Sequence, residues 1–214
     1  MLTNSTNVEL RERNLTPEVN SMRLANSAIR NSVFAAVLAV TSLSTSPAVS
    51  EEVYMIRGFL NVFSDGINQM TRQLRARGIR ANAISNGAWK NIGQSIIARA
   101  RKKKVSYPIV IVGHSLGGVE APDFANMLGR AGVPVALVIG LDPGFHTPRP
   151  FGKGIKRVIN YKIPSGKHYR GGKGFTGSIS TIDVSRYGVD HVGIDKSRKV
   201  QSLVIGKIRA QVGK

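Results

Sequence analysis

The sequence has 214 residues and no cysteine, and it carries 31 Lys and Arg against 12 Asp and Glu, a formal net charge of +19. This length suits one domain with a sizeable core, and the lack of cysteine excludes a disulfide framework, a thiol nucleophile, a zinc ribbon and an iron–sulfur cluster. No run of about 18 apolar residues occurs, so a membrane-spanning helix is not expected.

Residues 1–50 are predicted to form an N-terminal extension with a secretory signal peptide. An apolar stretch at 33–43 is too short to span a membrane, and Ala48 and Ser50 then occupy the positions that a signal peptidase requires. Cleavage before Glu51 predicts a periplasmic or secreted mature domain of residues 51–214. Because a start at Met22 gives a conventional basic leader, we hypothesise that residues 1–21 are a misassigned extension. The alternative is a buried amphipathic helix at 30–43.

Beyond residue 51, short apolar runs alternate with helical periods. Strands are predicted at 53–56, 79–84, 109–112, 135–139 and 158–161, and helices at 65–77, 88–104, 116–130 and 196–211. The Gly/Lys-rich part of 144–190 is expected to form loops with one or two strands. Such alternation predicts an α/β fold with a mostly parallel central sheet flanked by helices.

The run that ends the third predicted strand carries the clearest chemical motif. Gly113-His114-Ser115-Leu116-Gly117 is a Gly-x-Ser-x-Gly sequence placed between a Val/Ile strand and a helix. A serine in such a sharp turn stands above the sheet in a strained backbone conformation. The positions two before and two after it crowd each other, so Gly113 and Gly117 fit there. The pattern predicts that Ser115 is a nucleophile at a helix N-terminus; a turn that merely packs is the alternative.

With this motif in this position, the sequence resembles the α/β-hydrolase superfamily, in particular its lipase- and thioesterase-like members, over most of residues 53–211. The resemblance implies a minimal α/β-hydrolase fold, without a cap domain. It also implies a nucleophile, an acid and a histidine in the order Ser…Asp…His, with Ser115 as the nucleophile.

Two aspartates compete for the role of the acid. Asp142 follows the next predicted strand in a Gly-Leu-Asp-Pro setting that several lipases share, at the edge of the sheet where such sites are built. Asp183 is the rival, since many relatives place the acid one strand later. A third possibility is that Asp142 only caps a turn before Pro143. We favour Asp142.

Four histidines are available as the base. His191 lies just before the last helix, where the histidine loop of the superfamily belongs, and it is favoured over His168 in the basic loop. His114 adjoins the nucleophile and His146 follows Asp142 too closely to serve. The base must reach the serine hydroxyl and be oriented by the acid.

The resemblance also implies two backbone donors for an oxyanion. Leu116 follows the nucleophile and supplies one N–H, while Phe59, in the loop after the first strand, is favoured for the other, with Leu60 left open. Relatives often have His-Gly in that loop. Here Arg57 precedes Gly58, so the glycine is kept and the histidine is not.

These features predict a serine hydrolase that cleaves an ester or thioester of a small-molecule or lipid acyl substrate through an acyl-enzyme, without a metal or cofactor. The alternative is a non-catalytic or acyl-transferring protein of the same fold that binds an anionic cell-envelope component. Nothing in the sequence predicts the oligomeric state.

The positive charge belongs to the predicted mature domain, because residues 51–214 alone carry +18. Basic runs occur at 99–104, 153–157, 167–173 and 196–209, and each is consistent with a solvated face. Nucleic acid is disfavoured as the partner, since no helix-turn-helix, zinc-finger, RNA-binding or phosphate-loop signature occurs. An anionic membrane or envelope surface is the favoured partner. The segment 167–174 is expected to be a mobile loop near the edge of the active site.

Overall fold

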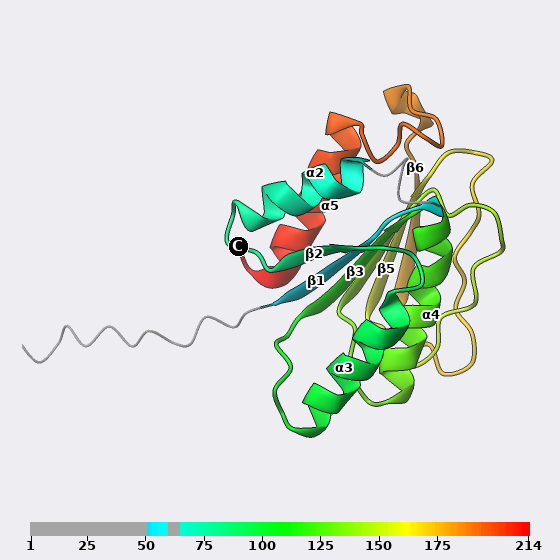
Figure 1. Ribbon diagram of the computed structural model, residues 1–214. Coiled ribbons are helices and arrows are strands. Elements are labelled where there is room, and N and C mark those ends of the chain that lie inside the picture. Colours follow the sequence, from blue (N-terminus) through cyan, green and yellow to red (C-terminus); the bar gives the residue numbers. More distant parts are fainter. Residues whose placement is uncertain (1–50, 60–64) are drawn as a thin grey trace, which may run out of the picture. The chain divides into compact units, whose positions relative to one another are not determined.

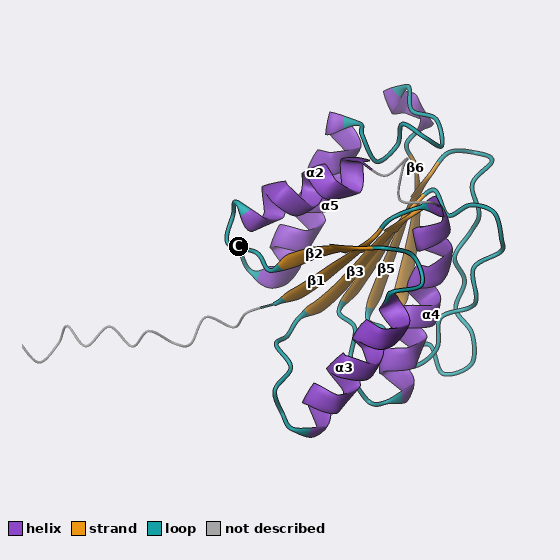
Figure 2. Ribbon diagram, viewed as in Figure 1, coloured by secondary structure: helices purple, strands orange, loops and turns teal. Residues whose placement is uncertain are grey.

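A computed structural model describes residues 51–59 and 65–214, so the predicted signal peptide, the Met22 start and Leu60 lie outside the described residues. The described chain forms a parallel sheet between two layers of helices (Figures 1 and 2). The strands lie in the order β2-β1-β3-β4-β5-β6. They are β1 (Glu52–Ile56), β2 (Ala81–Ile84), β3 (Ile109–His114), β4 (Leu137–Leu141), β5 (Arg157–Lys162) and β6 (Ser178–Asp183).

The helices are α2 (Asp65–Arg75), α3 (Trp89–Arg101), α4 (Leu116–Arg130) and α5 (Arg198–Val212), with a 3₁₀ turn, η2, at Ser185–Tyr187. Figure 1 shows α2 and α5 on one face of the sheet and α3 and α4 on the other. Each layer buries an apolar cluster against the sheet, as an amphipathic helix requires. Among the helices described, none is both long and apolar enough to cross a membrane.

The centre of the sheet consists of β1, β3 and β4, whose side chains are all buried. Val and Ile dominate these strands because both faces are covered by helices. The register pairs Ile56 with Gly113 and His114 with Leu141, so the carboxyl ends of the three strands meet along one edge. Residues that follow these strands in sequence therefore converge there.

The prediction of an α/β fold with a mostly parallel sheet is confirmed, and every strand pair in the described sheet is parallel. β4 begins two residues later than expected, because Val135 instead forms an isolated bridge with Ile155. β6 was not individually predicted. It is an edge strand whose sequence is mostly polar and whose side chains are largely exposed, so it lacks the apolar run of a central strand.

Glu52, in the first central strand, is buried with a full set of partners. Its carboxylate accepts hydrogen bonds from the Arg99 guanidinium at 2.5 and 2.8 Å, from the Tyr54 hydroxyl at 2.5 Å and from the Ser106 amide at 3.2 Å. Burial alone would raise the pKa of Glu52, but these donors outweigh it and the pKa is lowered. The network ties α3 to the strand that leads into the Arg57–Phe59 loop.

Replacing Arg99 by methionine should lower the free energy of unfolding by about 3 kcal/mol, because it leaves a buried carboxylate without its cation. Arg101→Met is the matched control: this side chain is exposed on the same helix, and its loss should cost less than about 0.5 kcal/mol. Urea denaturation followed by circular dichroism measures both. Equal losses in the two variants would contradict this account of Glu52.

Candidate active site

Ser115 lies in the turn between β3 and α4, with φ 55° and ψ −118°, a conformation that non-glycine residues rarely adopt. A Cβ on Gly113 would overlap the backbone of Gly117, and a Cβ on Gly117 would overlap the carbonyls of Ile56 and Arg57. Both positions therefore require glycine. The Ser115 amide donates to the Leu141 carbonyl at 3.0 Å, which fixes the turn on the neighbouring strand.

His191 and Asp142 form a hydrogen-bonded chain with this serine. Ser115 Oγ lies 2.8 Å from His191 Nε2, and His191 Nδ1 lies 2.6 Å from Asp142 Oδ2. An ionised carboxylate only accepts, so Nδ1 carries the proton and Nε2 is free to accept from the hydroxyl. The hydrogen bond that His191 donates to Asp142 raises the pKa of His191, while partial burial opposes the rise. The three side chains are thus arranged for transfer of the serine proton to an imidazole.

Asp142 directly follows β4 and is buried, with a φ of 45°. Its amide donates to the Tyr161 carbonyl in β5 at 2.8 Å, and its Oδ1 accepts at 3.1 Å from the amide of Ile163, the residue that directly follows β5. A Cβ at Gly166 would overlap Oδ1. The carboxylate therefore has one oxygen occupied by the backbone and directs the other at His191.

The rival residues have other surroundings. Asp183 ends β6, is exposed, and accepts a hydrogen bond from the Ser185 amide at 2.8 Å, which lowers its pKa. Among the described contacts, neither Asp183 nor the exposed His168 and His146 touches Ser115 or His191. No group of three or more His, Asp and Glu side chains in the described chain is placed to hold a metal ion.

His114, which sequence reasoning set aside as the base, supports the loop that carries His191. It is buried, and burial lowers its pKa. Its Nε2 donates to the His191 carbonyl at 2.9 Å, and its Nδ1 lies 3.9 Å from the buried Asp195. Asp195 Oδ2 accepts from the Ile67 amide in the first turn of α2. His114 and Asp195 thus link the turn at Ser115, the loop of His191 and α2.

A cavity of about 220 Å³ opens beside Ser115 and His191. Its rim consists of Phe59, Phe145 and Val192, all exposed, with the two phenyl rings 5.7 Å apart. The Leu116 amide is the first of α4, so it has no acceptor within the helix and lies at the positive end of the helix dipole, directly after Ser115 in the chain. Phe59 reaches the same cavity from the loop after β1.

Sequence reasoning missed the residues that shape the site from the basic segment. Tyr169 is buried there and donates to the Gly118 carbonyl at 2.6 Å, and its ring lies where a Cβ of Gly140 would be. The Lys167 amide donates to the Pro143 carbonyl at 3.2 Å. The segment therefore does run beside the site, as expected, but it is pinned by a buried aromatic ring. The one sequence feature that could have indicated this is Tyr169, because an aromatic residue among cations is a candidate for burial.

Comparison with known proteins identifies one family. The family described as Lipase (class 3) matches residues 26–135, which includes Ser115 and its flanking glycines. No curated protein sequence matches the chain significantly.

Several solved structures resemble the chain at low identity. A thioesterase domain from the nocardicin cluster is 11% identical with a TM-score of 0.46, over 77% of this chain and 95% of its own. ClbQ from the colibactin pathway is 12% identical with a TM-score of 0.44, over 77% of this chain and 97% of its own.

The imidazole of His191 should titrate above the ordinary histidine value of about 6.5, because its charged form is stabilised by Asp142. Asp142→Asn removes that negative charge, so the pKa of His191 should fall. Nuclear magnetic resonance of labelled histidines against pH measures both values.

Asp183→Asn is the matched control, since it removes an equal charge from the rival carboxylate and should leave the pKa of His191 where it is. If the pKa of His191 shifted in Asp183→Asn and not in Asp142→Asn, Asp142 would not be the partner of His191.

Proposed function

We propose that this chain, which belongs to the class 3 lipase family, is a serine hydrolase that cleaves an ester or thioester through an acyl-enzyme. The observation that supports this most directly is the chain of two hydrogen bonds from Ser115 through His191 to Asp142. Family membership supports an acyl substrate. The order of the three residues in the sequence is that of the α/β hydrolases.

In the first half of the reaction, Ser115 Oγ attacks the carbonyl carbon while His191 Nε2 takes the hydroxyl proton. Asp142 keeps the proton of the imidazole on Nδ1 and stabilises the cation that forms. Collapse of the tetrahedral intermediate breaks the bond to the leaving alcohol or thiol, which receives the proton from His191. Water then attacks the acyl-enzyme by the same route in reverse, releasing the acid and restoring the Ser115 hydroxyl.

The developing oxyanion is assigned to the amides of Leu116 and Phe59. Leu116 has the unpaired N–H of a helix start, where the dipole favours negative charge. Phe59 lies in the loop that follows the adjacent strand and borders the same cavity. Removal of one such donor from a hydrolase typically costs about 10²–10³-fold in kcat.

The acyl chain is assigned to the apolar rim of Phe59, Phe145 and Val192, which suits an aliphatic chain presented from outside the protein. The steps above use only side chains and backbone of the protein, so they call for no metal or cofactor. A lipid or a small acyl ester would fit this arrangement.

We also propose that the protein acts outside the cytoplasm, at the cell envelope. The signal peptide predicted in residues 1–50 would export a domain whose charge is +18. A field of this sign concentrates the protein at anionic surfaces of the cell envelope.

A fluorophosphonate probe should label the wild-type protein at Ser115, and Ser115→Ala should abolish labelling and lower ester hydrolysis by at least about 10³-fold. Ser165→Ala, which changes an exposed serine just before the basic segment, is the control and should be labelled like the wild type. Gel fluorescence and the rates on a panel of esters and thioesters of increasing chain length measure the outcome. A folded wild type that stays unlabelled and inactive on the whole panel would refute the proposal.

A further inference from the structure

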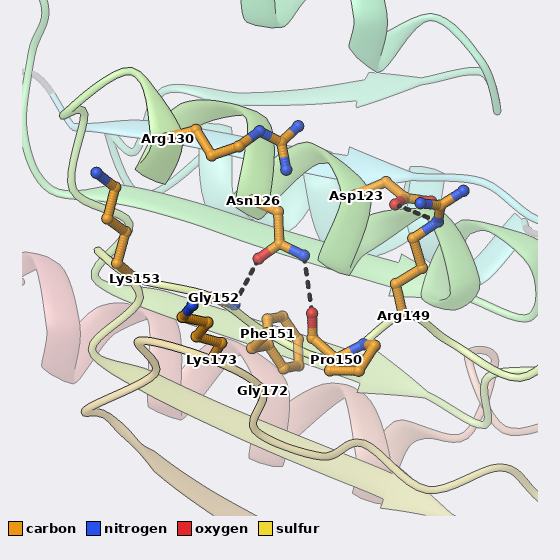
Figure 3. Close-up of a pocket in the computed structure, with 10 residues that line it drawn as sticks. All are labelled: Asp123, Asn126, Arg130, Arg149, Pro150, Phe151, Gly152, Lys153, Gly172 and Lys173. Atoms are coloured by element: carbon orange, nitrogen blue, oxygen red, sulfur yellow. Dashed lines mark hydrogen bonds and ion pairs between the residues drawn. The ribbon is translucent and has the colours of Figure 1, made fainter.

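A second cavity, of about 490 Å³, lies against the second half of α4 and shares no lining residue with the cavity at Ser115. Figure 3 shows Lys153 and Lys173 at one end, the Arg149 side chain beside Asp123 at the other, and Asn126 between them. Arg130, the last residue of α4, also faces it. Because a helix rises about 1.5 Å per residue, Arg130 is about 20 Å along α4 from Leu116.

Asn126 fixes the loop that forms one wall of this cavity. Its Nδ2 donates to the Pro150 carbonyl at 2.9 Å, and its Oδ1 accepts from the Gly152 amide at 2.7 Å (Figure 3). The amide side chain thus pairs with the backbone on both sides of the buried Phe151. The wall is therefore held on α4 without help from a ligand, and a site with a prebuilt wall loses little entropy on binding.

Close backbone contacts bring the cations together. A Cβ at Gly129 would overlap the Lys153 carbonyl, so the 153 segment lies directly against the end of α4. The Cβ position of Gly174 is 3.6 Å from the Cβ of Lys153, so the 173–174 turn also packs against Lys153. Arg130, Lys153 and Lys173 consequently surround the cavity from three separate segments.

The charges around this cavity are unbalanced. Arg149 Nε pairs with Asp123 Oδ1 at 3.2 Å. Within the described chain, no carboxylate comes within ion-pair distance of Arg130, Lys153 or Lys173. Like charges that share a cavity repel, and they attract an anion of matching geometry. A guanidinium fork and two ammonium groups suit the oxygens of a phosphate group.

We propose that this cavity binds an organic phosphate, with Arg130, Lys153 and Lys173 holding the phosphate group. The cavity is many times the roughly 30 Å³ that one water takes up in the liquid, so it has room for a substituent beyond the phosphate. A lipid headgroup and a soluble phosphate ester present the same chemistry. The proposal stands apart from the reaction at Ser115, because the two cavities have different walls.

Glycerol 3-phosphate serves as the soluble probe, and isothermal titration calorimetry measures its binding. The wild type should bind one equivalent saturably, and the triple variant Arg130→Gln/Lys153→Gln/Lys173→Gln should bind at least about tenfold more weakly, because charge-assisted hydrogen bonds are lost. The matched control is Arg198→Gln/Lys199→Gln/Lys207→Gln, which removes one arginine and two lysines from α5 on the other face of the sheet. It should weaken binding by less than about twofold, as a screened distant charge would.

Sedimentation with phosphatidylglycerol vesicles separates the two sources of phosphate. Loss of vesicle binding in the cavity variant alone, together with loss of glycerol 3-phosphate binding, supports the site and assigns a lipid headgroup. Equal vesicle binding by both triple variants, with glycerol 3-phosphate binding lost only in the cavity variant, supports the site and assigns a soluble ester. Equal weakening of glycerol 3-phosphate binding in both variants, or no saturable binding by the wild type, overturns the proposal. Fluorophosphonate labelling of Ser115 in each variant reports separately on folding and on the first site.

Discussion

The crowding of backbone around Ser115 is the constraint on which the site depends. A serine held in this sharp turn forces the chain on either side of it into contact, and only Gly113 and Gly117 leave room for the carbonyls and amides that meet there. The first amide of α4 follows this turn directly. One strained residue thus determines where the Ser115 hydroxyl and the start of α4 lie, and the buried strands β1, β3 and β4 hold it in place.

Polar contacts position His191 within its loop, and the neighbouring Ile194 packs into the core. His114 holds the His191 carbonyl, Asp142 holds the imidazole, and Gly144 leaves space for the ring, since a Cβ there would lie 2.7 Å from His191 Cε1. Burial lowers the pKa of His114, whereas the hydrogen bond to Asp142 raises the pKa of His191. The pKa values of these two neighbouring imidazoles are therefore shifted in opposite directions. That division suits His114 to a fixed structural role and leaves His191 available to exchange a proton.

Local patterns were sufficient for the central elements, because a buried parallel strand has a signature along the chain. The motif at Ser115, with the resemblance to the α/β hydrolases, singled out Asp142 and His191, and the fold brings these two side chains into a hydrogen-bonded chain with Ser115. Local patterns were insufficient for β6, whose polar edge pattern resembles a loop. Gly166, Tyr169 and the cavity beside Arg130 depend on segments that meet only in the folded chain. The same limit applies to the basic runs. Their charge is evident from composition, but only the fold shows that three of the cations line one cavity.

The central claim is that Ser115 forms a covalent acyl intermediate. Mixing the wild type with a p-nitrophenyl ester, quenching with acid during the first turnover and mapping the peptides by mass spectrometry tests it most directly. The account predicts one acyl group on the peptide that contains Ser115, formed with a burst of p-nitrophenol and absent after longer incubation. An acyl group on a lysine or another residue, or turnover without any acylated peptide, would contradict it.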